Sequence, residues 1–205
     1  MTVRPLIIFA KAPVPGQVKT RLIPALGPEG ACALYEKLLR HTLEKTRNWP
    51  GERLLYCAPD TTHPVIQSLA HEHQLTLRQQ QGGDLGERMA NAHADHPNGA
   101  LLIGTDCPLL DCAHLHAANQ ALAQHDIAII PSEDGGYVLI GQRVPHITPF
   151  NNMTWSHADV LTDTQERVTG AGLTLWLGAT LWDLDEPEDL QRLAAAGIST
   201  ELALS

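Results

Sequence analysis

The sequence predicts an α/β fold with a mainly parallel, mixed sheet that is covered by helices on both faces. Short and almost entirely apolar runs alternate along the chain with longer stretches whose apolar residues recur at helical spacing. Such alternation is typical of strands joined by crossover helices, and continuous apolar runs are typical of strands buried on both faces. No internal repeat, low-complexity tract or linker interrupts the pattern. We therefore expect residues 1–205 to form one domain.

The first half of the chain supplies four of the expected strands. Residues 6–10 form an apolar run that Pro13 and Pro15 bring to an end, because proline lacks a backbone donor. A helix is expected to begin near Pro28, which suits a first helical turn, since apolar residues follow at helical spacing as far as Leu43. The other elements expected here are a strand at 53–57, a helix at 63–71, a strand at 75–77, a helix at 85–94 and the clearest strand at 100–104.

The second half begins with a helix expected from about residue 113 to 123. The apolar runs at 127–130 and 137–140 predict two strands that lie too close in sequence for a crossover helix. A hairpin or an antiparallel edge strand is therefore expected at this point. The remaining expected elements are a helix near 157–169, a strand at 173–177 and a final helix at 187–195.

Charge and composition argue against several classes of protein. The formal net charge of −9 at pH 7 repels polynucleotide phosphates, so a nucleic acid polymer is not an expected partner. No segment approaches the roughly eighteen apolar residues of a membrane span, and a membrane is not an expected partner either. Cys32, Cys57, Cys107 and Cys112 show neither a C-x-x-C pair nor zinc-ligand spacing. They are interpreted as free thiols, and a cytoplasmic protein of open oligomeric state is expected.

The loop after the first strand is the first candidate for ligand binding, because ligands of open α/β sheets lie beyond the carboxyl ends of the strands. Residues 11–21 contain Lys11, Lys19 and Arg21, three of the 14 lysines and arginines of the chain. Gly16 permits close approach of the backbone to a ligand. The loop is not a Walker A motif, because only one glycine precedes Lys19. Binding of phosphate groups is favoured over a solvated basic turn.

Aspartates in two further loops are candidate ligands of a metal. Asp106 directly follows the clearest strand, and its carboxylate suits Mg²⁺ or Mn²⁺. A role as helix N-cap is disfavoured by Pro108 and by the gap before the next helix. Asp183 and Asp185 precede the final helix, and they could share one cation with Asp106 if that segment folds back to it.

Two glycine-containing segments are less specific. Glu133 and Asp134 precede a pair of glycines, and turn formation alone explains that pattern. Gly83 lies in a segment where glycines would let a flat ring approach the backbone. Asp84 in the same segment is a candidate N-cap for the helix that carries Arg88.

The 11 histidines show no metal-binding pattern. Three closely spaced pairs occur in separate helical segments without a third partner. We interpret them as solvated helix faces; they are His71/His73, His93/His96 and His114/His116.

Six segments in this order resemble one known family: FAKAPVPG (9–16), KTRL (19–22), GDLGERM (83–89), GTDCP (104–108), EDGGY (133–137) and DLDEPEDL (183–190). It is the bacterial glycosyltransferase-A-like family associated with radical-SAM and selenium or arsenosugar gene clusters, formerly classed as a domain of unknown function. The resemblance covers nearly the whole chain. It implies the Rossmann-like, three-layer glycosyltransferase-A fold of the nucleotide-diphospho-sugar transferases. Molybdenum-cofactor and phospholactate nucleotidyltransferases share that fold.

The resemblance also implies roles for particular residues. Asp106 would bind the metal, Asp185 would complete the metal site, and Asp183 would be the second choice there. It moves Asp134 from a turn residue to a site residue. Glu186 stands where family members more often have threonine. The residues that would bind the nucleotide are Lys11, Ala12, Gly16, Lys19, Arg21, Gly83, Asp84 and Arg88.

These expectations combine into one hypothesis, a metal-dependent glycosyltransferase that moves a sugar from a nucleotide-diphospho-sugar donor to a small-molecule acceptor. Mg²⁺ or Mn²⁺ would bridge Asp106, Asp185 and the diphosphate. Asp134 or Glu133 would orient or deprotonate the acceptor hydroxyl. A nucleotidyltransferase that releases pyrophosphate is the alternative, disfavoured because the first loop has fewer glycines than is usual there. A non-catalytic nucleotide-binding module is a third possibility.

Overall fold

A seven-stranded sheet forms the centre of the computed structural model, which describes residues 2–195 and 198. Every strand except β6 runs in the same direction. The carboxyl ends of the parallel strands therefore open at one edge of the sheet, where their loops can form a common site. The strands in order across the sheet are β3 (Thr76–Gln79), β2 (Arg53–Ala58), β1 (Leu6–Lys11), β4 (Ala100–Ile103), β6 (Tyr137–Gln142), β5 (Ile127–Pro131) and β7 (Leu175–Leu177).

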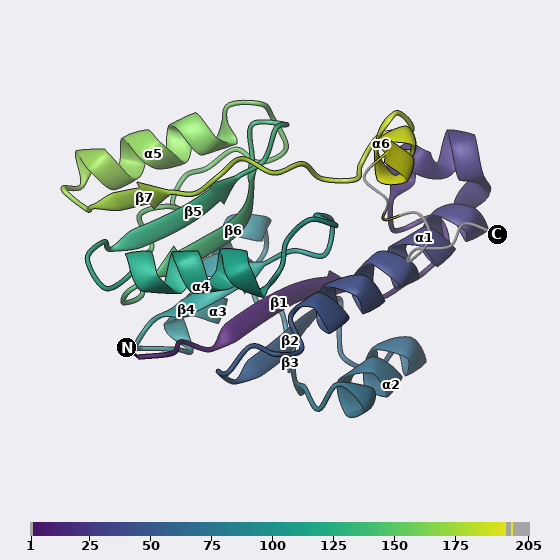
Figure 1. The fold of residues 1–205 in the computed structure, drawn as a ribbon, viewed down its shortest axis with the longest axis horizontal. Coiled ribbons are helices and arrows are strands. Elements are labelled where there is room, and N and C mark those ends of the chain that lie inside the picture. The colour runs from purple at the N-terminus through teal and green to yellow at the C-terminus, as the bar shows by residue number, and fades with distance from the viewer. Residues whose placement is uncertain (1, 196–197, 199–205) are drawn as a thin grey trace.

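Helices cover both faces of this sheet, which gives the three layers that the sequence predicts (Figure 1). Side chains of β1 alternate between the faces, so that Leu6 and Ile8 belong to one apolar cluster and Ile7 and Phe9 to the other. The first cluster also contains residues of α1 (Ile23–Lys45), α2 (Pro64–Glu72) and α4 (Cys112–Ala121). The second contains residues of α3 (Leu85–Ala94) and α5 (Val160–Gly170).

Helix α1 begins earlier than expected. The chain leaves β1, passes through the short 3-10 helix η1 (Thr20–Leu22) and enters α1 at Ile23. Gly27 interrupts α1 with φ of 70°, and Pro28 begins the second helical stretch there. The expected start near Pro28 is therefore the start of that second stretch. Helix α6 (Asp189–Ala195) packs through Leu193 in the same apolar cluster as the first half of α1 (Figure 1).

The hairpin expected between residues 127 and 140 is confirmed, because β5 and β6 pair antiparallel. An edge position for an antiparallel strand is wrong, since β6 lies between β4 and β5 and β7 forms the edge. Gly135 in the turn has φ of 87°, and a Cβ there would overlap the carbonyl of Ala158. Only glycine therefore allows the loop before α5 to approach this turn so closely.

In the part of the chain that the structure describes, no helix combines the length and apolarity needed to cross a bilayer. All four cysteines are free thiols.

The interpretation of the histidines as solvated is wrong for His73 and His93, both of which are buried. His93 is 1% exposed and stacks on Phe150, with ring centroids 5.8 Å apart. Neither of its ring nitrogens has a hydrogen-bond partner. Burial, followed by the nearby His96, lowers the pKa of His93 from 6.5 to about 3.

This buried imidazole predicts a loss of stability in mild acid. Near pH 7 His93 is neutral in both the folded and the unfolded chain. Below pH 6.5 the unfolded chain takes up a proton that the folded chain accepts only near pH 3, so the free energy of unfolding falls as the pH falls. Between pH 7 and pH 5 the contribution of His93 is about 2 kcal/mol. His93→Leu is expected to remove this part of the pH dependence in urea unfolding.

The exposed His71 on α2 provides the control, because His71→Leu removes a histidine without removing a buried one. Its pH profile is expected to match that of the natural protein. If His93→Leu kept the full loss of stability between pH 7 and pH 5, the assignment to His93 would be wrong.

Candidate active site

The loops at the carboxyl edge of the sheet surround a cleft of about 790 Å³. Several separate stretches of the chain line it, among them the loop after β1, α3, the loop after β4, the β5–β6 turn, the loop before α5 and the segment between β7 and α6. In Figure 1 this last segment crosses from β7 toward α6. Eight of the predicted site residues line the cleft: Lys11, Lys19, Arg21, Arg88, Asp106, Asp134, Asp183 and Asp185.

Five other predicted site residues do not line the cleft. The backbone of Ala12 donates to the Ala58 carbonyl, and Gly16 forms an exposed turn with φ of 80°. Asp84 caps α3 by accepting from the Glu87 backbone at 2.8 Å, as the sequence predicts. Gly83 donates its backbone N–H to the Glu87 carboxylate at 2.7 Å. Glu133 pairs with Arg192 at 3.0 Å, on the side of α6.

The ammonium of Lys19 joins the basic first loop to the acidic loops. Its Nζ lies 2.5 Å from Oδ1 of Asp106, 2.7 Å from Oδ1 of Asp185 and 2.6 Å from the carbonyl oxygen of Leu184. The Lys19 side chain is 4% exposed, whereas those of Asp106 and Asp185 are 45% and 40% exposed. The predicted approach of Asp106 to the first loop is therefore present in the structure.

A backbone hydrogen bond joins the two acidic loops, and the Asp189 carboxylate stabilises the second of them. The Leu184 backbone donates to the Asp106 carbonyl at 2.9 Å, and Asp189 accepts from the backbones of Asp185 and Glu186 at 3.0 and 2.9 Å. Helix α4 takes Asp111 as its N-cap. Asp106 is thus free of the capping role that was its alternative explanation.

Two buried groups of the cleft, Asp183 and Lys19, have shifted pKa values. Burial raises the pKa of Asp183 to about 7, and the neighbouring Asp106 adds to this, although the Ser132 hydroxyl donates to Asp183 at 3.0 Å. Burial alone would lower the pKa of Lys19, but the carboxylates of Asp106 and Asp185 outweigh it and raise that pKa. The cleft therefore contains more carboxylate charge than Lys19 neutralises.

The donor set fits a divalent cation that takes part of its coordination from a ligand. Asp106, Asp183 and Asp185 offer carboxylate oxygens, the donors that Mg²⁺ and Mn²⁺ prefer. A cation would offset both the burial that mainly raises the pKa of Asp183 and the repulsion from Asp106 that adds to it. Among residues 2–195 and 198, no three His, Cys, Asp or Glu side chains are already arranged around a cation position. Substrate oxygens and water would have to complete the shell, as is usual for Mg²⁺.

Sequence reasoning missed several residues that shape the cleft. The Tyr35 hydroxyl, on α1, accepts from the Lys11 backbone N–H at 2.7 Å and donates to the Lys11 carbonyl at 3.1 Å. Gln80, after β3, donates to the carbonyls of Ala10 and Tyr56. Gln80 could have been identified because it follows the carboxyl end of a strand. Tyr35 could not, because it occurs among the apolar residues of its helix and is predicted to belong to the core. Trp155 lies in a loop without a motif.

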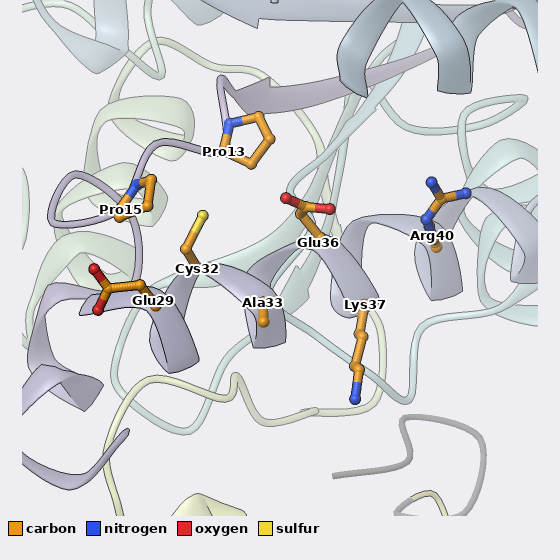
Figure 2. Close-up of a pocket in the computed structure, with 8 residues that line it drawn as sticks. All are labelled: Pro13, Pro15, Glu29, Cys32, Ala33, Glu36, Lys37 and Arg40. Atoms are coloured by element: carbon orange, nitrogen blue, oxygen red, sulfur yellow. The ribbon is translucent and has the colours of Figure 1, made fainter. Parts of the chain in front are cut away.

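A second hollow, of about 360 Å³, lies between the first loop and α1. Figure 2 shows Pro13 and Pro15 on one side of it, and Glu29, Cys32 and Glu36 along the helix. Burial, followed by Glu36 and Glu29, raises the pKa of the Cys32 thiol, so it is a poor nucleophile. This hollow does not include the acidic residues of the cleft.

The comparisons with known proteins place the chain beside bacterial relatives. Residues 42–157 match the profile of a family described as "Uncharacterized protein conserved in bacteria (DUF2064)". A comparison with curated proteins gives no match. The chain is 30% identical to a protein from Desulfovibrio desulfuricans G20 that is provisionally described as a nucleotide-diphospho-sugar transferase. The likeness covers 100% of this chain and 92% of that chain, with a TM-score of 0.87.

More distant structures share the fold alone. CMP:2-keto-3-deoxy-manno-octonic acid synthetase, complexed with CTP, is 10% identical over 96% of this chain and 99% of that chain, with a TM-score of 0.57. Rv0371C from Mycobacterium tuberculosis H37Rv, in complex with manganese, is 16% identical over 95% and 100%, with a TM-score of 0.52. The predicted Rossmann-like α/β fold of the nucleotide-sugar transferases is thereby confirmed.

Proposed function

Since the chain belongs to the DUF2064 family of bacterial proteins, and is similar over its whole length to a provisionally described nucleotide-diphospho-sugar transferase, we propose that it is a metal-dependent glycosyltransferase. The donor would be a nucleotide-diphospho-sugar and the acceptor a small molecule. The observation that carries this proposal is the meeting of Lys19 with Asp106 and Asp185 in one cleft. It brings cations for a diphosphate and carboxylates for a metal to the same place.

The diphosphate would lie against the loop after β1. Lys11 and Arg21 line the cleft there and would neutralise charge that builds up on the leaving nucleoside diphosphate. Arg21 also pairs with Glu186 at 3.3 Å, which links this loop to the acidic segment. Arg88, from α3, would contact the nucleotide from the opposite wall. Ala12, Gly16, Gly83 and Asp84 would act by shaping the two loops.

The metal would be held by Asp106 and Asp185, with Asp183 beside them. When bound, Mg²⁺ or Mn²⁺ supplies positive charge that stabilises the departing diphosphate. Asp106 and Asp185 orient toward the first loop through their contacts with Lys19. Burial favours the neutral form of Asp183, and a bound cation would favour its carboxylate form.

The acceptor would occupy the other half of the cleft. Asp134 lines the cleft, and its carboxylate accepts from the Gly136 backbone at 2.9 Å, which fixes its direction. It would take the proton of the acceptor hydroxyl. Glu133 is committed to Arg192, so Asp134 is the better placed of the two. Leu85, Val138 and Trp155 also line the cleft and would suit an acceptor with an apolar face.

Product analysis tests this proposal. Incubation with nucleotide-diphospho-sugars, Mg²⁺ and a panel of hydroxyl acceptors is expected to release a nucleoside diphosphate. Tight nucleotide binding without turnover of any donor would instead indicate a non-catalytic binding module.

Nucleotidyl transfer is the second candidate, favoured by one observation. The three cations Lys11, Lys19 and Arg21 all line the cleft, and together they could neutralise a triphosphate as well as a diphosphate. Release of pyrophosphate from a nucleoside triphosphate in the same assay would establish this reaction and overturn glycosyl transfer. The association with radical-SAM and selenium or arsenosugar gene clusters stays a prediction from the sequence resemblance.

A further inference from the structure

The position of the Lys19 ammonium has a consequence for the order of ligand binding. An ammonium has three N–H donors, and Lys19 directs Nζ at three oxygens within 2.7 Å: one each from Asp106, Asp185 and the Leu184 carbonyl. Two carboxylate oxygens and a backbone carbonyl oxygen are also the kind of ligand set that a hard cation takes. Lys19 therefore lies where the proposed function requires a divalent cation.

We infer that Lys19 is a placeholder for the metal: its ammonium occupies the cation position until a nucleotide arrives, and then moves to the phosphates while the metal takes its place. This inference rests on the proposed function and adds an order of binding to it. Lys19 adopts φ of 46°, a left-handed conformation that lysine seldom adopts, and it lies between the turn at Gly16 and η1.

The placeholder makes metal and nucleotide binding depend on each other. In the ligand-free protein a metal must displace a buried ammonium from two carboxylates, so the apparent metal affinity is reduced by the small fraction of molecules with the position open. A nucleotide offers Lys19 a new anionic partner and so raises that fraction. By linkage, the metal must raise the nucleotide affinity by the same factor.

Direct measurement of Mn²⁺ binding by electron paramagnetic resonance tests this without any turnover. In the natural protein, Mn²⁺ alone is expected to bind weakly, and a nucleoside diphosphate is expected to tighten it strongly. In Lys19→Met, Mn²⁺ alone is expected to bind at least about tenfold more tightly than in the natural protein. The further gain from the nucleotide is expected to shrink in that variant.

Two further variants keep the test decisive. Lys11→Met removes the same charge from the same cleft but leaves the Lys19 contacts in place, so it reports the general effect of a lost cation. Its Mn²⁺ affinity without nucleotide is expected to stay within about twofold of the natural value, because the position remains filled. Lys19→Gln keeps a hydrogen-bond donor near the carboxylates, and it replaces Lys19→Met if the latter does not fold by circular dichroism.

Each outcome has a separate meaning. Metal binding to the Lys19 variants that is no tighter than to the natural protein would overturn the placeholder and leave the proposed function intact, provided that the natural protein binds Mn²⁺ with nucleotide. Equal tightening in Lys11→Met would also overturn it, in favour of a general electrostatic effect. Absence of Mn²⁺ binding to every form, with and without nucleotide, would overturn both the inference and the metal dependence on which it rests.

Discussion

Asp106→Asn is expected to lower the metal-dependent affinity for a nucleoside diphosphate by about a hundredfold or more. The change removes the carboxylate charge that would hold the metal, and it takes away one of the two acidic partners of the buried Lys19 ammonium. Because asparagine is nearly isosteric with aspartate, the loop after β4 should keep its shape, including the hydrogen bond from the Leu184 backbone to the carbonyl of residue 106. Calorimetric titration with and without Mg²⁺ measures the effect.

The matched control is Asp159→Asn, which makes the same chemical change at a highly exposed aspartate before α5. Its nucleotide affinity is expected to stay within about twofold of the natural value, since an exposed charge contributes little. Metal-dependent binding that survives in Asp106→Asn would refute the assignment of Asp106 as a metal ligand.

Asp134→Asn is expected to reduce kcat by roughly 10²- to 10⁴-fold, the usual contribution of a general base, with little change in KM for the donor. Asparagine can still accept the hydrogen bond from the Gly136 backbone, so the turn should persist while the proton acceptor is lost. Steady-state kinetics with a saturating acceptor separates the two parameters.

Glu133→Gln provides the control at the neighbouring position. Glu133 points to Arg192 rather than into the cleft, so its loss is expected to weaken one partly exposed ion pair and leave kcat nearly unchanged. Equal losses of kcat in the two variants would contradict the role given to Asp134. A loss confined to Glu133→Gln would move the role to that residue.

Much of the fold could be predicted because its strands are buried on both faces. β1 and β4 are continuous apolar runs, so their existence and their parallel arrangement follow from the pattern. The internal position of β6 could not be predicted, because the hairpin connection fixes its pairing with β5 but not its pairing with β4. The burial of His93 was also missed. Its helix has polar residues on several sides, and the sequence does not reveal that Phe150 covers this imidazole.

The candidate site could be located by one physical rule, that parallel strands end at a common edge. That rule places Asp106 and the loop of Lys19 together, and the structure has them in contact. The rule does not predict which polar groups form hydrogen bonds and ion pairs with each other across that edge. The bridging of Asp106 and Asp185 by Lys19 depends on side-chain reach and burial between segments far apart in the chain. The hydrogen bond between Tyr35 and Lys11 likewise depends on the reach of a buried side chain from another segment of the chain.

The proposed function requires that one cleft binds a nucleotide and a divalent cation together. A thermal-shift screen of nucleoside diphosphates, nucleoside triphosphates and nucleotide-diphospho-sugars, each with and without Mg²⁺, tests it most directly, because a ligand that binds only the folded chain raises its melting temperature. We predict that at least one nucleotide raises the Tm in the presence of Mg²⁺ and has little effect in its absence. If no nucleotide raised the Tm, or if the rise were the same without Mg²⁺, the claim would be contradicted.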